Sequence, residues 1–205
     1  LEQMKDLGPL ALVEEGLPYR YRKPHDGMVQ IVSALAIAVD PAMGEYSGKP
    51  PQGTSWQRGV ILETLMRMKV DLARFGDAGT NFDYANLSDR IIPGCYVTLR
   101  LTEVDFSRAR LEGCYFESCD FRDTRFSGGS LRDCIFNHNT FVNVSLDGCD
   151  LRGADFDENG TFENVTCRGA RLSLDTIFAN GGFPDADGAV FAKESDQGEL
   201  VTREE

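Results

Sequence analysis

A five-residue repeat of large apolar side chains constrains this chain more than any other feature of its sequence. From Phe82 to Ile177 a large apolar residue stands at almost every fifth position. The unbroken run is Leu101, Phe106, Leu111, Phe116, Phe121, Phe126, Leu131, Phe136, Phe141, Leu146, Leu151 and Phe156. A helix repeats every 3.6 residues and a strand every two, so neither keeps one face apolar at this period. The chain must therefore turn a corner within each repeat.

The residues around each central apolar residue divide into an inward set and an outward set. Two positions before the centre, the residues are small: Val104, Ala109, Cys114, Cys119, Thr124, Gly129, Cys134, Asn139, Val144, Cys149 and Ala154. The position just before the centre is often Asp or Asn, and the two positions after it are mostly polar or charged. We therefore expect the centre and the small residue to point inward, and the other three positions to face solvent.

This pattern resembles the pentapeptide-repeat family, whose unit is a small residue, Asp or Asn, Leu or Phe, and two variable residues. The clearest copies lie at 85–87, 104–106, 119–121, 149–151 and 154–156, within a stretch from 80 to 177. The resemblance implies an all-β repeat solenoid, a right-handed quadrilateral β-helix with four repeats to a coil. A pair of amphipathic helices ahead of the repeats is also similar to an arrangement in bacterial members of the family.

Four repeats to a coil place each residue beside the residue about twenty positions later, and four columns fit this spacing. The columns are Phe82, Leu101, Phe121, Phe141, Phe162; Leu87, Phe106, Phe126, Leu146, Cys167; Ile92, Leu111, Leu131, Leu151, Leu172; and Val97, Phe116, Phe136, Phe156, Ile177. Five coils at the strand spacing of about 4.8 Å make a rod of roughly 24 Å. Some successive members of a column are not twenty residues apart. These departures predict a missing residue between Val97 and Leu101, and an extra one between Phe156 and Phe162. Both irregularities fall at one corner.

The chain divides into four predicted segments. These are an extended arm (1–27), a helical cap region (28–79), the β-helix (80–177) and an acidic C-terminal segment (178–205), which we expect to be a flexible tail.

Within the cap region, helical spacing of apolar residues predicts an amphipathic helix over 28–39. A loop over 41–53 separates it from a second helix, in which Thr54 and Gln57 form a capping box and Gly76 marks the end. The stripe of this second helix is Ile61, Leu65, Met68, Leu72 and Phe75. We expect the helices to cover the open end of the first coil, where apolar side chains and backbone would otherwise be exposed. The alternative is that they form a docking surface.

No residue of this chain is expected to be catalytic, to bind a cofactor or to bind a metal. His25 and His138 fall at positions expected to be solvated, and no nucleophile and base stand at recognisable spacing. The six cysteines occupy inward positions without a CxxC motif, which predicts buried free thiols. Free thiols favour a reducing compartment, so we expect a cytoplasmic protein. Asn139 is a polar residue in an inward slot, and its amide should bond the backbone at the corner.

The charge of the chain argues against nucleic acid and anionic lipid as partners. The net charge is −12, and residues 101–177 hold 14 acidic and 8 basic side chains. Binding to phosphate groups needs neutralising cations instead. The basic aromatic stretch 19–23 is the exception; it could contact nucleic acid, lipid headgroups, an acidic partner or the acidic rod of this chain. No apolar run is long enough to span a bilayer. The chain starts at Leu1, which indicates a fragment or a processed product, so membrane association is expected only through a segment upstream.

The sequence therefore predicts a noncatalytic protein-interaction or scaffold module built on a rigid rod. Its partner would be a protein of unknown identity, and the oligomeric state is open. The family resemblance implies one alternative, an acidic DNA mimic that acts on a type II topoisomerase. A rod of roughly 24 Å matches only about seven base pairs, which argues against this alternative. A further alternative is a targeting domain of a larger membrane-anchored protein.

Overall fold

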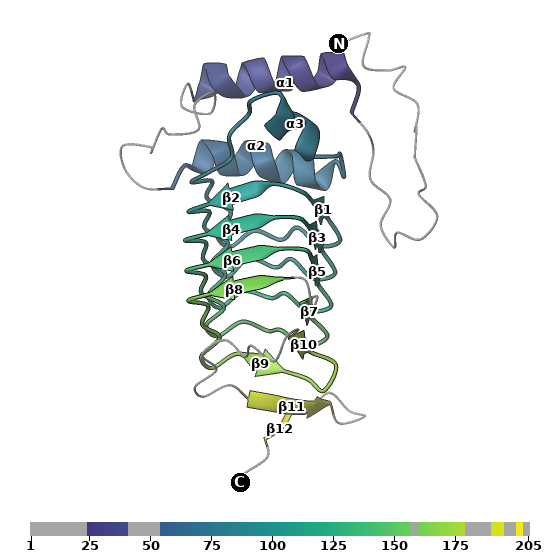
Figure 1. Ribbon diagram of the computed structural model, residues 1–205, viewed down its shortest axis with the longest axis vertical. Coiled ribbons are helices and arrows are strands. Elements are labelled where there is room, and N and C mark those ends of the chain that lie inside the picture. The colour runs from purple at the N-terminus through teal and green to yellow at the C-terminus, as the bar shows by residue number, and fades with distance from the viewer. Residues whose placement is uncertain (1–23, 41–53, 157–159, 179–189, 195–199, 203–205) are drawn as a thin grey trace.

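The protein is a right-handed β-solenoid with three helices stacked on one end (Figure 1). The computed structural model describes residues 24–40, 54–156, 160–178, 190–194 and 200–202, the last two ranges as backbone only. Most of the expected arm, including the basic stretch 19–23, and the expected loop over 41–53 lie outside the described residues. The fold class predicted by the five-residue repeat is confirmed.

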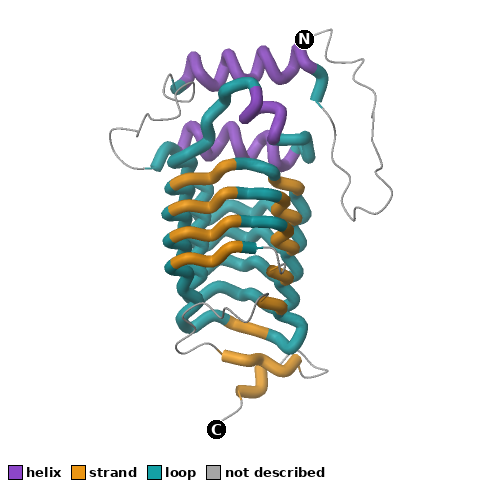
Figure 2. The backbone as a smooth tube through the Cα atoms, in the orientation of Figure 1, coloured by secondary structure: helices purple, strands orange, loops and turns teal. Residues whose placement is uncertain are grey.

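Two parallel sheets form two adjacent faces of the solenoid. One sheet contains β1 (Tyr96–Val97), β3 (Tyr115–Glu117), β5 (Ile135–Asn137), β7 (Asp155–Phe156) and β10 (Ile177–Phe178). The other contains β2 (Arg100–Thr102), β4 (Asp120–Arg122), β6 (Thr140–Val142) and β8 (Thr161–Glu163). Single bridges such as Asp105 to Arg125 hold the remaining two faces, where the chain runs as turns (Figure 2). Together the strands and bridges make about four turns.

The twenty-residue register is confirmed, including its irregularities. Leu101 pairs with Phe121 and Phe121 with Phe141, twenty residues apart, whereas Val97 pairs with Phe116 after nineteen. The missing residue therefore lies between Val97 and Leu101, as predicted. Phe141 pairs with Phe162 after twenty-one residues, which confirms the extra residue of the later coil.

The predicted column is wrong at its last member. Phe178, and not Ile177, pairs with Phe156. The Phe178 ring stacks on the Phe156 ring with a centroid distance of 4.8 Å, whereas Ile177 is 52% exposed. An aromatic ring buries more apolar area on its neighbour than a branched aliphatic side chain does, so the last coil takes one more residue to bring it inward.

Stacked aromatic rings fill the interior. The Phe116 and Phe136 ring centroids are 4.9 Å apart and nearly parallel, and Phe121 stacks on Phe141 at 5.0 Å. Between the two columns, Phe121 meets Phe136 edge to face at 6.3 Å. Each of these four rings is fully buried. Stacking along the rod and edge contacts across it use both favourable aromatic geometries.

Where Cys or Thr fills the small inward slot, its side chain also donates a hydrogen bond. The Cys134 thiol donates to the Leu111 carbonyl oxygen over 3.0 Å, and the Thr124 hydroxyl donates to that of Leu101 over 2.6 Å. In both pairs the acceptor is the central residue of the preceding coil. Cys and Thr therefore fit the slot because they are small and also satisfy a buried carbonyl.

The Asn139 side chain also donates a hydrogen bond to a carbonyl of the preceding coil, and in addition it accepts one. Its amide nitrogen donates to the Phe116 carbonyl oxygen over 2.9 Å, and its side-chain oxygen accepts from the Cys119 backbone N–H over 2.6 Å. The expectation that this amide bonds backbone at the corner is confirmed, and both bonds run to the preceding coil. A buried amide with both groups paired avoids the desolvation cost that an unpaired one would carry.

All six cysteines are free and buried, as predicted. Burial raises the pKa of the Cys119 thiol to about 12 and that of Cys149 to about 12. Cys95 differs, because a hydrogen bond with the Cys114 side chain lowers its pKa and the charges of Lys69 and Arg67 act in the same direction.

The helical cap departs from the prediction in its boundaries. α1 (Asp26–Val39) begins earlier than expected, with the His25 side chain accepting from the Gly27 N–H at its N-terminus. α2 (Trp56–Arg67) is capped by Ser55 and not by Thr54. The predicted second helix breaks near Lys69, where φ is 52°, and α3 (Ala73–Asp77) forms a separate turn that contains Gly76. No helix among the described residues is long and apolar enough to cross a membrane.

The cap is joined to the rod through its backbone. Ser55 bridges to Ala85 as a strand residue would, and the Asn86 N–H donates to the Ser55 carbonyl oxygen over 2.8 Å. A Cβ on Gly59 would lie 1.8 Å from the Asn86 carbonyl oxygen, so only glycine allows α2 this close. Leu62 of α2 is fully buried in the same core as the rod. The helices cover the open end of the first coil, as expected.

The C-terminal segment contains strands where a flexible tail was expected. β11 (Val190–Glu194) pairs in parallel with β9 (Arg171–Leu172) and antiparallel with β12 (Leu200–Thr202). The backbone of Phe191 pairs with that of Leu172, nineteen residues earlier in the chain. The prediction of a flexible tail is therefore wrong for these residues. The acidic composition of the segment suggested a tail, whereas its short apolar stretch forms a strand.

The register can be tested by comparing two adjacent residues. Phe121→Ala should lower the free energy of unfolding by about 3 to 5 kcal/mol, because ladder hydrogen bonds prevent the coils from closing the cavity. Arg122→Ala should cost under about 0.5 kcal/mol, because its side chain is 48% exposed and its ion pair with Asp120 is solvated. Denaturant melts measure both. Similar losses for the two variants would contradict the register.

The burial of the thiols can be tested chemically. The thiolate is the reactive form, so pKa values of about 12 should make Cys119 and Cys149 react slowly with a disulfide reagent near pH 8. Six thiols should titrate after unfolding in guanidinium. Because these folded pKa values exceed the ordinary 9.0, their contribution to stability should be complete below pH 9.0 and fall away towards pH 12. Rapid titration of all thiols in the native protein would disprove the inward placement.

Candidate functional site

The outward residues of the rod carry paired charges. Asp89 and Arg108 form two hydrogen bonds of 2.7 Å on the solvent side of adjacent coils, and this contact lowers the pKa of the Asp89 carboxyl. The Asp150 carboxylate accepts two hydrogen bonds from the Arg152 guanidinium, and the Glu112 carboxylate accepts one from Arg110. Several of the outward acids are therefore neutralised locally.

The outward positions singled out in the sequence face solvent as predicted. Arg122 and Arg125 are exposed, and Arg132 is partly exposed on a neighbouring face. His138 is exposed too, in a left-handed backbone conformation with φ of 55°. His25 is exposed, but it has a structural role as the cap of α1 that the sequence analysis missed.

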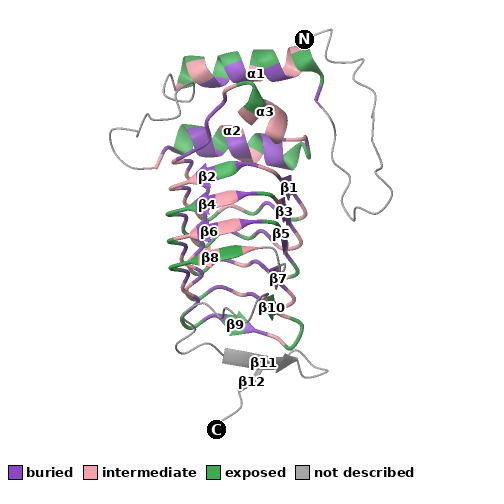
Figure 3. Cartoon of the chain, viewed as in Figure 1, coloured by how far each residue is buried: buried purple, intermediate pink, exposed green. Residues whose placement is uncertain are grey.

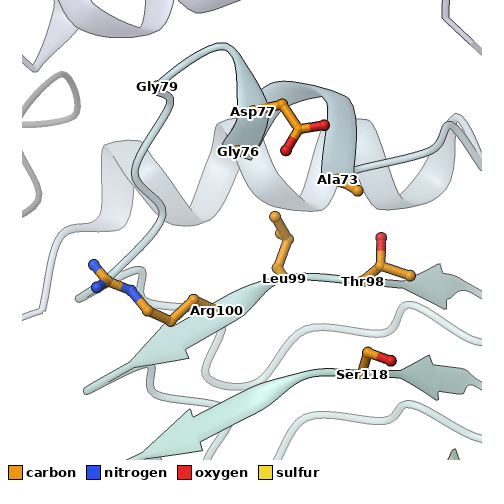
Figure 4. A pocket seen from close by; sticks show the side chains of 8 residues that line it. All are labelled: Ala73, Gly76, Asp77, Gly79, Thr98, Leu99, Arg100 and Ser118. Atoms are coloured by element: carbon orange, nitrogen blue, oxygen red, sulfur yellow. The ribbon is translucent and has the colours of Figure 1, made fainter.

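A hollow of about 530 Å³ lies between α3 and the first corner of the rod, and we call it the cap groove (Figure 4). Its residues are Ala73, Gly76, Asp77 and Gly79 from α3 and the following turn, Thr98, Leu99 and Arg100 from the first coil, and Ser118 from the second. Figure 4 shows the Leu99 and Thr98 side chains pointing up toward α3. The cap groove thus lies at the boundary between the helical cap and the rod.

The cap groove lies at the corner where the first coil is one residue short. The pairing of β2 with β4 places Leu99, a large residue, at the position that Cys119 and Asn139 occupy in the next two coils. Leu99 is buried, and its methyl group would lie 3.7 Å from a Cβ on Gly76. A departure from a regular repeat that packing does not require often marks a functional position.

The cap groove presents charged, polar and apolar groups. Asp77 offers an exposed carboxylate and Ser118 an exposed hydroxyl, while Leu99 forms an apolar floor. The buried Thr98 hydroxyl has no hydrogen-bond partner in the described part of the chain. The residues that line the groove include neither a histidine nor a cysteine.

Arg100 is directed away from the cap groove. Its guanidinium pairs with Asp83, a buried carboxylate that also accepts from the Thr102 N–H over 3.1 Å. Burial raises the pKa of Asp83, and its bonds to Thr102 and Arg100 oppose that shift. Arg100 therefore forms its ion pair at the junction of the cap and the rod. The anionic Asp77 is left as the charged group of the groove.

No metal centre is formed by the described residues, where no group of three His, Cys, Asp or Glu side chains could hold a metal ion. The cap groove itself was not predicted. The one sequence signal at this corner is the nineteen-residue step at Val97, which predicts a missing residue but not a hollow.

Comparison with known proteins agrees with the architecture. Residues 100–137 match the family model of pentapeptide repeats, with 8 copies. A search of curated proteins found no match.

Similar solved structures include QnrB1, a plasmid-mediated fluoroquinolone resistance protein, with 15% sequence identity and a TM-score of 0.32 over 53% of this chain and 80% of that chain. The pentapeptide repeat protein alr5209 from Nostoc PCC 7120 is 18% identical, with a TM-score of 0.27 over 69% of this chain and 98% of that one. Rfr23 from the cyanobacterium Cyanothece 51142 is 18% identical, with a TM-score of 0.20 over 47% and 58%. The family model and the four-sided coils together show that residues 100–137 are built from pentapeptide repeats.

Proposed function

We propose that this protein is a noncatalytic interaction module that binds a protein partner at the cap groove. The observation that carries the proposal is a hollow at the corner where the repeat loses a residue, lined by groups that packing leaves available. The regular coils need no such hollow, since their inward residues stack without it. Ser118 and Asp77 face solvent, so a partner can reach them without unfolding the cap.

The chemistry of the cap groove favours a polypeptide segment with a basic side chain. Asp77 attracts a cation, the exposed Ser118 hydroxyl donates and accepts hydrogen bonds, and Leu99 packs against an aliphatic stem. A lysine or arginine side chain combines a charged head with such a stem. The acidic rod, with a net charge of −12 over the whole chain, would attract the same kind of partner at longer range.

The pairing of charges along the rod counts against the DNA-mimic alternative. A surface that imitates the phosphate backbone needs regularly spaced negative charges. Here Asp89, Asp120 and Asp150 each pair with an arginine. We therefore favour a protein partner and expect no direct binding of nucleic acid. The free, buried thiols suit a reducing compartment, and a cytoplasmic location remains a prediction.

Charge reversal in the cap groove tests this function. Asp77→Lys should reduce recovery of the partner in a pull-down from the parent cells at least about tenfold, because the lysine repels the basic side chain and a tenfold loss needs only about 1.4 kcal/mol. Its melting temperature should stay nearly unchanged, since Asp77 is exposed at the end of a short helix. Quantitative mass spectrometry of the captured proteins provides the measurement.

Asp133→Lys is the matched control, because Asp133 is an exposed acid on a rod corner outside the groove. It should capture the same proteins as the wild type. Ala73→Arg, which places a bulky side chain in the groove, should behave like Asp77→Lys. Equal capture by all variants would rule out the groove, and turnover of a substrate that a rod substitution abolishes would refute the noncatalytic assignment.

A further inference from the structure

The outermost helix has an apolar face that the described part of the protein leaves open. α1 lies beyond α2 and α3, at the end of the molecule farthest from β11 (Figure 1). Its inner side buries Val29 and Ala36, yet on the outer side Ile31 is 63% exposed and Leu35 and Val39 are 60% exposed (Figure 3). A helix that is apolar on all sides is normally buried, so this face fits a covered position.

Uncharged residues run along the whole of α1. From Gly27 to Val39 there is no charged side chain, and the acids at its two ends are paired within the protein. Asp26 pairs with Arg74, and Asp40 accepts from Arg58 over 2.6 Å. The outer face is therefore neutral as well as apolar. A lipid surface is disfavoured, since helices that lie on membranes carry Lys or Arg beside the apolar face.

We propose that the outer face of α1 binds the same face of a second copy of this chain. The residues along it alternate in size, with Ile31 and Leu35 large and Ala34 and Ala38 small, and all four are exposed. In an antiparallel pair centred between residues 34 and 35, Ile31 meets Ala38 of the other copy and Ala34 meets Leu35. A large side chain then faces a small one at the four central levels, while Gln30 meets Val39 at the two ends, so the surface is self-complementary across a two-fold axis.

The distribution of charge allows this arrangement. The described cap residues 24–40 and 54–79 hold five acids and four bases, whereas the excess acid lies in the rod and beyond it. Two copies joined at α1 point their acidic rods in opposite directions, which keeps like charges far apart relative to the Debye length of about 10 Å. Antiparallel α1 helices also place opposite dipole ends together.

The size of the face predicts a weak dimer. A helix of 14 residues is about 21 Å long and about 10 Å wide. The area of its outer face is therefore well below the roughly 800 Å² per partner of a stable interface. We therefore expect a concentration-dependent dimer with a Kd on the order of 10 µM. The cap groove lies between α3 and the rod, on the other side of α3 from α1, so this dimer does not depend on the function proposed for the groove.

Sedimentation velocity between about 1 and about 200 µM tests the proposal, since this range brackets the expected Kd. The wild type should shift from monomer to dimer, and Leu35→Lys should weaken the dimer at least about tenfold. Leu174→Lys is the control, because Leu174 is 83% exposed at the opposite end of the rod. It should dimerise like the wild type.

An exchange of sizes tests the pairing itself. Leu35→Ala should weaken the dimer because an alanine then faces an alanine, and Ala34→Leu should weaken it because two leucines collide. The double variant restores one leucine opposite one alanine, so its Kd should return to within about threefold of the wild type. Failure of the double variant to recover would overturn the proposed register.

Three results would overturn the proposal outright. A monomer at every concentration would exclude a second copy. A large loss of melting temperature in Leu35→Lys would indicate that residues of this chain outside the described ranges cover the face. Cosedimentation of the wild type with phosphatidylglycerol vesicles, lost in Leu35→Lys, would assign the face to a membrane surface.

Discussion

Each coil satisfies its backbone hydrogen bonds through the coils on either side of it, and the rest of the structure depends on this constraint. The Tyr115 N–H donates to the Cys95 carbonyl oxygen and the Phe106 N–H to that of Arg125, each over 2.7 Å. A coil alone would leave these groups unpaired, as would either end of the stack. The Ser55 bridge at one end and β11 at the other are the solutions that the described residues show.

The same constraint explains why so much of the rod could be predicted. Phe121 must stack between Leu101 and Phe141 for the ladder to close, so the inward register repeats in the sequence. Where the ladder weakens, prediction failed as well: spacing alone did not distinguish Ile177 from Phe178 in the last coil. The boundary between α2 and α3 was missed because the left-handed turn at Lys69 interrupts an apolar stripe that continues in the sequence.

The cap groove could not be predicted, because it is a property of space between elements. Thr98 and Ser118 are at least twenty-one residues from the groove residues of α3, and no spacing rule connects them. The repeat indicates only that a residue is missing. It does not indicate that α3 lies above that corner, with Gly76 close to the Leu99 side chain and Phe75 fully buried. The exposure of the outer face of α1 could not be predicted either, since the helical pattern does not show which side of the helix packs against the rest of the protein.

The backbone junction at Gly59 and Ser55 bears on how the molecule is made. Ser55 presents the first coil with a strand-like edge, so a chain leaving the ribosome has a template before its first repeat is complete. Each coil offers its neighbour the same kind of edge, so folding can propagate from the cap along the rod. A side chain at position 59 would push α2 away from Asn86 and so separate this starting edge from the first coil. A single glycine is therefore a condition for the cap to serve as a template for the rod.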